Sequence, residues 1–302
     1  MKNRLIIFIP ALFIIIALTL SCQTASKILD AGAKAAGDAG LINSNTAAAI
    51  SQSARAIGTA AEEITPEQEY YIGRAVAANI LSSYKIYTGS PALTNYLNLI
   101  CSAITINSPR PDVYNGYHVA ILDNNEINAF ATSGGHIFVT RGLINAAKSE
   151  DALAAVIAHE VAHIQLQHSI KAIRTSRITQ ALLVTGTSAA GAVTGMDVKE
   201  LTNVFNESVG EIIQTLVNNG YSQAQEFDAD NTAMSLLAAA GYNPSGLVAM
   251  LNELRNVQSS GSGFGKTHPT PAQRITNAQR TVGNFKVTDT SASRQARFAA
   301  AK

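Results

Sequence analysis

The feature that most constrains this chain is a pair of histidines, His159 and His163, within a run of apolar residues. The residues from Ser149 onward have the polar start and the apolar period of a helix, which we expect to extend to about Lys171. The flanking residues are apolar enough to place this helix in the core. Burying two imidazoles and the carboxylate of Glu160 there is costly unless a partner compensates them. The segment therefore predicts a buried helix that carries chemistry.

The spacing of the two histidines is that of ligands to one metal ion. Residues four apart differ by about 40° around a helix axis, so both imidazoles project from the same face. Glu160 lies about 100° away, too far round to join as a ligand but close enough to reach a water on the open side of the metal. This is the HExxH arrangement of zinc peptidases, in which the glutamate is the general base. We therefore expect one Zn²⁺ per chain.

A third protein ligand must come from outside this helix. A metzincin would have glycine at position 166 and histidine at position 169, where this chain has Leu166 and Ser169. His168 is five residues past His163, about 140° round the helix, so it is expected to be a solvated polar residue that cannot share the metal.

Two later segments offer a glutamate followed four residues on by a second acid: Glu207 with Glu211, and Glu226 with Asp230. We favour Glu226, because a break in the chain and a capping box before it place it in the first turn of a new helix. Asp230, one turn further, is placed to accept a hydrogen bond from the second nitrogen of a ligand histidine. The alternative is that these acids only complement the dipole of their helix.

The segment Glu226–Asp230, behind an HExxH helix, resembles the glutamate motif of the HtpX-like and CAAX-prenyl-endopeptidase-like zinc metallopeptidases. This family includes periplasmic quality-control proteases of bacterial outer membranes. The similarity covers roughly residues 65–282 and includes four further segments: 128–130, 134–143, 267–269 and 274–275.

The resemblance implies a gluzincin endopeptidase whose zinc is held by three residues: His159, His163 and Glu226. Glu160 would then activate the water. His268 is implied to approach the zinc, either occupying the position of the water in a resting form or stabilising the oxyanion. The alternative for His268 is an ordinary polar loop residue before the next helix. Arg274 is expected to pair with a carboxylate near the site.

We expect an α+β fold, mostly helical and zincin-like, with one small sheet. Strands are predicted over residues 117–122, 127–131 and 136–140, with a turn at 133–135 between the last two. The last strand is expected to be an edge strand that lines the active site, where an extended substrate adds as a further strand. The predicted substrate-binding residues are Gly135, His136, Ile137 and Phe138.

The first residues have the organisation of a secretory signal. Lys2 and Arg4 precede an apolar run of 16 residues that ends at Leu20, and Ser21-Cys22 follows, which resembles the lipobox of bacterial lipoproteins. We therefore expect Cys22 to be lipidated and to anchor the chain to the outer membrane of a bacterial envelope, facing the periplasm. The alternative is an uncleaved transmembrane anchor, for which 16 residues are short.

Composition divides the chain into four parts: a signal peptide (1–21), an Ala/Gly/Ser-rich tether with one weak helix around 47–61 (22–63), a zinc metallopeptidase domain (64–285) and a flexible tail (286–302). Residues 178–196 are uncharged but too polar in composition to insert into a membrane. Cys101 lies in an apolar run and is expected to be a buried core thiol.

Charge excludes one class of partner. The 22 Lys and Arg residues balance 21 Asp and Glu residues, and no basic stripe is present, so nucleic acid is not expected to bind. The predicted function is a zinc metalloendopeptidase that hydrolyses unfolded or misassembled envelope proteins. The alternative is a chaperone or assembly factor for outer-membrane proteins that binds exposed strands with little proteolysis. A purely structural metal is less favoured, because structural sites normally have four protein ligands and Glu160 would have no role.

Overall fold

A computed structural model of the chain describes residues 22–60, 63–106, 108–175, 210, 213, 220–257, 263–268, 271–287 and 290–302. They fall into two compact units, one of residues 1–64 and 171–205 and the other of residues 65–170 and 206–302. The predicted signal peptide, the stretch 178–196 and the pair Glu207 and Glu211 lie outside the described residues.

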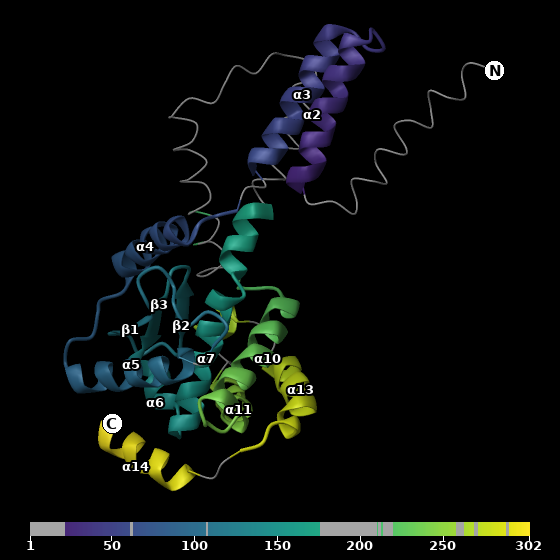
Figure 1. Ribbon diagram of the computed structural model, residues 1–302. Helices are drawn as coiled ribbons and strands as arrows, with labels where there is room; N and C mark the ends of the chain where they lie inside the picture. The colour runs from purple at the N-terminus through teal and green to yellow at the C-terminus, as the bar shows by residue number, and fades with distance from the viewer. Residues whose placement is uncertain are drawn as a thin grey trace. The chain divides into compact units, whose positions relative to one another are not determined.

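The first unit contains a helical hairpin of α2, Cys22–Asp38, and α3, Ser44–Ala60 (Figure 1). Composition predicted a tether with one helix here, and the structure has two. A Cβ on Gly37 would lie 2.7 Å from the Cβ of Ala47, and a Cβ on Gly58 would lie 2.5 Å from the Oγ of Ser26. Glycine, alanine and serine at these contacts therefore let α2 and α3 approach each other closely, although neither helix has large apolar side chains there. Among the described helices, none has the length and apolar composition needed to cross a bilayer.

The second unit contains a three-stranded sheet in the order β1-β3-β2: β1 is His118–Leu122, β2 is Ala129–Thr132 and β3 is His136–Thr140. β3 pairs in parallel with β1 and antiparallel with β2, with Phe130 opposite Phe138. The three predicted strands are confirmed, but the prediction that His136–Thr140 forms an edge is wrong. β2 returns as a hairpin on one side of β3, and β1 pairs on its other side, so both sides of β3 are already hydrogen-bonded.

The turn between β2 and β3 requires glycine. Gly134 and Gly135 have φ angles of 79° and 99°, which L side chains rarely adopt. A Cβ on Gly134 would also lie 2.5 Å from the Cα of Tyr70, and one on Gly135 would overlap the carbonyl oxygen of Gly116. The hairpin is therefore fixed closely against its neighbours.

Helices surround the sheet, and α7, Glu150–Gln165, lies at the centre of the unit (Figure 1). The remaining elements are α4 (Pro66–Ser83), α5 (Pro91–Thr105), α6 (Arg141–Ala146), α10 (Gln223–Ala239), α11 (Ser245–Val257), α12 (Phe264–Thr267), α13 (Pro271–Thr281), η3 (Val282–Asn284) and α14 (Ser291–Ala301). α7 contacts α5, α10, α11, α14 and β2, and its residues 152–164 are all buried. The predicted caps are confirmed at Thr65 for α4, Ser149 for α7 and Ser222 for α10. Cys101 is buried as predicted, and burial raises the pKa of its thiol to about 12.

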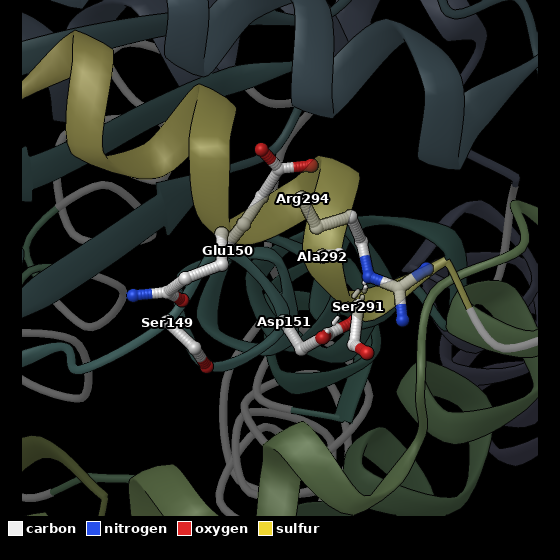
Figure 2. Close-up of a pocket in the computed structure, with 7 residues that line it drawn as sticks. Ser149, Glu150, Asp151, Ser291, Ala292 and Arg294 are labelled. Atoms are coloured by element: carbon white, nitrogen blue, oxygen red, sulfur yellow. Dashed lines mark hydrogen bonds and ion pairs between the residues drawn. The ribbon is translucent and has the colours of Figure 1, made fainter.

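The segment predicted to be a flexible tail contains α14, which packs against the start of α7. Arg294 pairs with Asp151 at 2.9 Å, and Arg297 pairs with Glu150 at 2.6 Å. Figure 2 shows Arg294 beside Asp151 in a pocket of about 360 Å³ between the two helices. The side chain of Phe298, on the same helix, is buried in the hydrophobic core. One aromatic anchor and two ion pairs thus order a segment whose composition alone predicted fraying.

Candidate metal centre

α7 brings His159, Glu160 and His163 into the interior, where each side chain is at most 2% exposed. The Nε2 atoms of the two histidines lie 3.0 Å apart, so both rings direct the same nitrogen to one point, as their spacing predicts. The carboxylate of Glu160 lies beside this point. Its Oε1 atom accepts no hydrogen bond from the described residues.

Glu226 and Asp230 reach the same place from the first turns of α10, and both are fully buried. The carboxylate oxygens of Glu226 lie 3.5 Å from Nε2 of His159 and 3.6 Å from Nε2 of His163. Asp230 lies behind the cluster, with its Oδ1 3.0 Å from Nδ1 of His159. The structure therefore brings Glu226 to the front of the two imidazoles and Asp230 to the back of one of them.

His268 follows α12 directly and joins the cluster. Its Nδ1 lies 3.3 Å from Nε2 of His159 and 3.1 Å from Oε1 of Glu226, while its Nε2 lies 3.5 Å from Oε1 of Glu160. The ring stacks on Phe264 with a centroid distance of 4.2 Å. His268 thus lies between the metal-ligand candidates and Glu160.

α12, which directly precedes His268, is anchored to the residues just before β2. The backbone N–H of Phe264 donates to the carbonyl of Ile127 at 2.7 Å, and the hydroxyl of Thr267 donates to Oδ1 of Asn128 at 3.0 Å. The position of His268 is therefore coupled to the segment that leads into the edge strand.

Arg274 on α13 is 1% exposed and compensates the two carboxylates of α10. Its Nε and Nη2 donate to Asp230 at 2.8 and 2.7 Å, and its Nη1 lies 2.8 Å from Oε2 of Glu226. Burial alone would raise the pKa values of Glu226 and Asp230, but the guanidinium of Arg274 holds both pKa values below the usual range.

The charges of this site are unbalanced without a cation. Three buried carboxylates, of Glu160, Glu226 and Asp230, face one guanidinium, which leaves two negative charges uncompensated when the imidazoles are neutral. Burial and Arg274 act to lower the pKa of His159, but Asp230 and Glu226 outweigh them and raise it to about 9. Burial also raises the pKa of Glu160.

A divalent metal ion fits this set of residues. His159, His163, Glu226 and His268 each offer one ligand atom, and these atoms all lie within 4.8 Å of one another. Tetrahedral zinc with bonds of about 2.0–2.2 Å places its ligand atoms about 3.3–3.6 Å apart. The separations of 3.0–3.6 Å given above are close to that spacing. Nitrogen and carboxylate ligands are also those that zinc takes in catalytic sites.

The structure contradicts the prediction that His168 is a solvated residue, although His168 is not among the candidate metal ligands. Its side chain is 3% exposed, and its Nδ1 lies 2.9 Å from Nδ1 of His163. α7 ends at Gln165, Gln167 has a φ of 54°, and the chain is helical again from residue 168. Counting 100° per residue from His163 therefore fails, because no continuous helix joins the two residues.

Tyr221 was not predicted to belong to the site. Its buried ring stacks on His163 at a centroid distance of 4.2 Å and an interplanar angle of 18°. Its position directly before the capping box of α10 was the available signal, because the residue preceding an N-cap often packs against the protein.

The predicted substrate-binding residues 135–138 do not line an open edge. Gly135 is in the β2–β3 turn, Ile137 and Phe138 are buried on the central strand, and the ring of His136 stacks on Tyr70 at 5.5 Å. The strand edge beside α7 belongs to β2. The outer edge of β1 is partly covered, because the N–H of Tyr87 donates to Ile121 at 2.7 Å.

The site combines two imidazoles from one helix with a glutamate from a second helix, and a further glutamate lies beside them whose Oε1 accepts no hydrogen bond from the described residues. This is the arrangement of HExxH metallopeptidases whose third ligand is a glutamate. A comparison with protein-family models gives the same class and makes it specific. Residues 91–282 match peptidase family M48, and the chain belongs to this family.

Individual relatives are proteases. The chain is 25% identical over 250 residues to the beta-barrel assembly-enhancing protease of Yersinia pestis, covering 80% of this chain and 50% of that protein. It is 32% identical over 150 residues to the metalloprotease LoiP of Escherichia coli (strain K12), covering 49% and 56%. It is 28% identical over 155 residues to the mitochondrial metalloendopeptidase OMA1 of Schizosaccharomyces pombe, covering 49% and 41%. The chain thus spans about half the length of the curated relatives it matches.

Proposed function

We propose that this protein is a zinc metalloendopeptidase in which His159, His163 and Glu226 hold the metal. The observation that carries the proposal is the convergence of these three side chains on one buried point beside the carboxylate of Glu160. One zinc per chain would replace the two missing positive charges of the site. The chemistry supplied by bound zinc is polarisation of the scissile carbonyl and acidification of the attacking water.

Glu160 is the general base in this proposal. Its carboxylate takes the proton of the attacking water and passes it to the leaving amine. Burial raises the pKa of Glu160, which makes the side chain a better proton acceptor than an exposed carboxylate. Asp230 accepts from Nδ1 of His159, keeping Nε2 of that ring directed at the metal, and Arg274 compensates the charge of Asp230 and Glu226.

His268 closes the fourth position of the resting site. Its Nδ1 lies within the spacing of the other ligand atoms, where it would exclude water, and its Nε2 is directed toward Glu160. When α12 moves, the same ring is placed to donate to the developing oxyanion. Because α12 is anchored beside β2, the movement that frees the fourth position also changes the approach to the edge strand.

The substrate class follows from strand pairing. An extended peptide that adds to β2 would lie across α7 and would be recognised mainly through its backbone, so side-chain identity is read weakly. Such recognition suits unfolded or misassembled envelope proteins, and the relative from Yersinia pestis is named for its role in beta-barrel assembly. Lipidation of Cys22 would hold the peptidase at the periplasmic face of the outer membrane.

The test separates the metal from the base. Chelation, His159→Ala and His163→Ala are each expected to remove both zinc and cleavage of an unfolded substrate such as casein. Glu160→Gln is expected to keep stoichiometric zinc and to lose about 10²–10⁴-fold in cleavage rate, because it acts on water and does not bind metal. Zinc content is measured by atomic spectrometry. Stoichiometric zinc in the double alanine variant, or wild-type cleavage by Glu160→Gln, would contradict the proposal.

A further inference from the structure

The two ligand histidines of α7 have different partners behind them. In both rings Nε2 is directed to the cluster, and Nδ1 points away from it. Nδ1 of His159 meets the carboxylate of Asp230 at 3.0 Å, whereas Nδ1 of His163 meets Nδ1 of His168 at 2.9 Å. One ring is thus supported by an anion and the other by an imidazole.

A partly buried hydrogen-bond network stabilises the turn that precedes His168. The amide of Gln167 donates to Oε2 of Glu69 at 3.1 Å, and Glu69 is 2% exposed. Arg110 pairs with the same carboxylate oxygen at 3.1 Å and also donates to the carbonyl of Ile164, in the last turn of α7, at 3.1 Å. The left-handed conformation of Gln167 is therefore stabilised from α4 and from the loop before β1.

Tyr221 restricts the ring of His163 from its face while His168 restricts it from its edge. The Tyr221 ring is nearly parallel to His163 at 4.2 Å and also lies 5.6 Å from the centroid of His168. With one neighbour on the face and one at Nδ1, the imidazole of His163 has its plane and its direction fixed before any metal arrives.

We propose that His168 is a positioning residue for His163. This inference rests on the metal site proposed above. When Nε2 of a histidine binds a metal, its proton is on Nδ1, which must then donate a hydrogen bond. Nδ1 of His168 is the acceptor, so His168 carries its own proton on Nε2. An imidazole accepts this bond without adding a fourth buried carboxylate to a site that already has three.

The test compares two substitutions in the full-length chain, His168→Asn and His168→Leu. The amide oxygen of asparagine can take the place of Nδ1 as an acceptor, whereas leucine keeps a similar bulk and accepts nothing. The zinc dissociation constant is measured by competition with a chromophoric chelator. His168→Leu is expected to weaken zinc binding about 10–100-fold, and His168→Asn is expected to recover most of this loss. In zinc-loaded protein, the slowly exchanging Nδ1–H proton of His163 should be visible by NMR in the wild type and in His168→Asn, and lost in His168→Leu.

Thermal unfolding of the metal-free variants shows whether each one is folded. If His168→Leu does not fold, His168→Gln replaces it, because its amide lies one carbon further from the backbone and is expected to miss Nδ1 of His163. Equal zinc affinity in the wild type and the acceptor-less variant would overturn the inference while leaving the proposed function intact. Equal losses in His168→Asn and His168→Leu, with the His163 Nδ1–H signal retained in both, would also overturn it. A wild-type chain that binds no zinc would refute the metal site itself.

Discussion

Replacing Arg274 with leucine tests whether buried charge balance controls the stability of this protein. Arg274 is 1% exposed and is held by two carboxylates, at 2.7–2.8 Å from Asp230 and 2.8 Å from Glu226. Removing one partner of a buried ion pair costs about 3–5 kcal/mol, because the remaining charge stays desolvated. At about 2–4 °C per kcal/mol for a domain of this size, the metal-free variant should melt about 6–20 °C below the wild type.

Zinc should reduce this loss. A bound divalent cation supplies two positive charges beside the carboxylates, so the difference in melting temperature between variant and wild type should shrink by at least about half in excess zinc. Differential scanning calorimetry in EDTA and in excess zinc measures both gaps. Arg141→Leu is the matched control, because Arg141 and Asp123 form a partly exposed pair at 2.9 Å, and an ion pair near the surface is worth about 0–1 kcal/mol. A loss for Arg274→Leu as small as that of the control, or one independent of zinc, would refute the reasoning.

The same substitution should change the acid response. In the folded protein Arg274 holds the pKa values of Glu226 and Asp230 below the ordinary values of 4.5 and 3.8. Their contribution to stability is therefore present above those values and is lost as the pH falls through the lower folded values. Without Arg274 this contribution disappears. The difference in melting temperature between variant and wild type, measured in EDTA, should therefore narrow below about pH 4. A gap that stays constant from pH 7 to pH 3 would contradict the assignment.

Three further outcomes are expected. Glu226→Ala should lower zinc affinity by more than about tenfold in a competition assay, and Glu207→Ala should leave it unchanged; the reverse result would move the third ligand to the earlier acidic pair. His268→Ala should retain zinc and cleave unfolded substrates faster than the wild type, because opening the fourth position outweighs the loss of an oxyanion donor; unchanged kinetics would make His268 an ordinary loop residue. Gly135→Ala should lower the melting temperature by several degrees, because its φ of 99° and the carbonyl of Gly116 leave no room for a Cβ; a wild-type melting temperature would show that the turn can relax.

Local signals in the sequence predicted the parts of the fold that are local in the chain. The cap at Ser149, the capping box at Ser222 and the i, i+4 spacing of His159 and His163 each involve residues within one helical turn, and each is seen in the structure. The strand boundaries were also predicted to within about two residues, because short apolar runs between turn residues mark them.

Long-range pairing accounts for what the sequence did not predict. The central position of β3 depends on parallel pairing with β1, which no turn between neighbouring strands specifies. The ordering of α14 depends on Asp151 and Glu150, more than 140 positions earlier in the chain. No glycine or proline marks the end of α7 after Gln165. The turn there is instead stabilised by the side chain of Glu69 from another helix, which the local sequence does not reveal. The prediction that His168 is solvated was wrong because it assumed that the helix continued.

The deep burial of the cluster would control how fast a metal ion enters and leaves the proposed site. The four candidate ligand side chains are 0–3% exposed, and His268 is tied in place through the anchored α12. Neither an aquated ion nor a chelator molecule can reach ligand atoms that are buried this deeply, so each exchange must wait for a fluctuation that opens this part of the chain. The rate of zinc removal should then rise with chelator concentration only at first, and level off at the opening rate of the protein. An ion enclosed during folding would therefore persist for reasons of kinetics as well as affinity, and the metal carried by purified protein would reflect what was present when the chain folded.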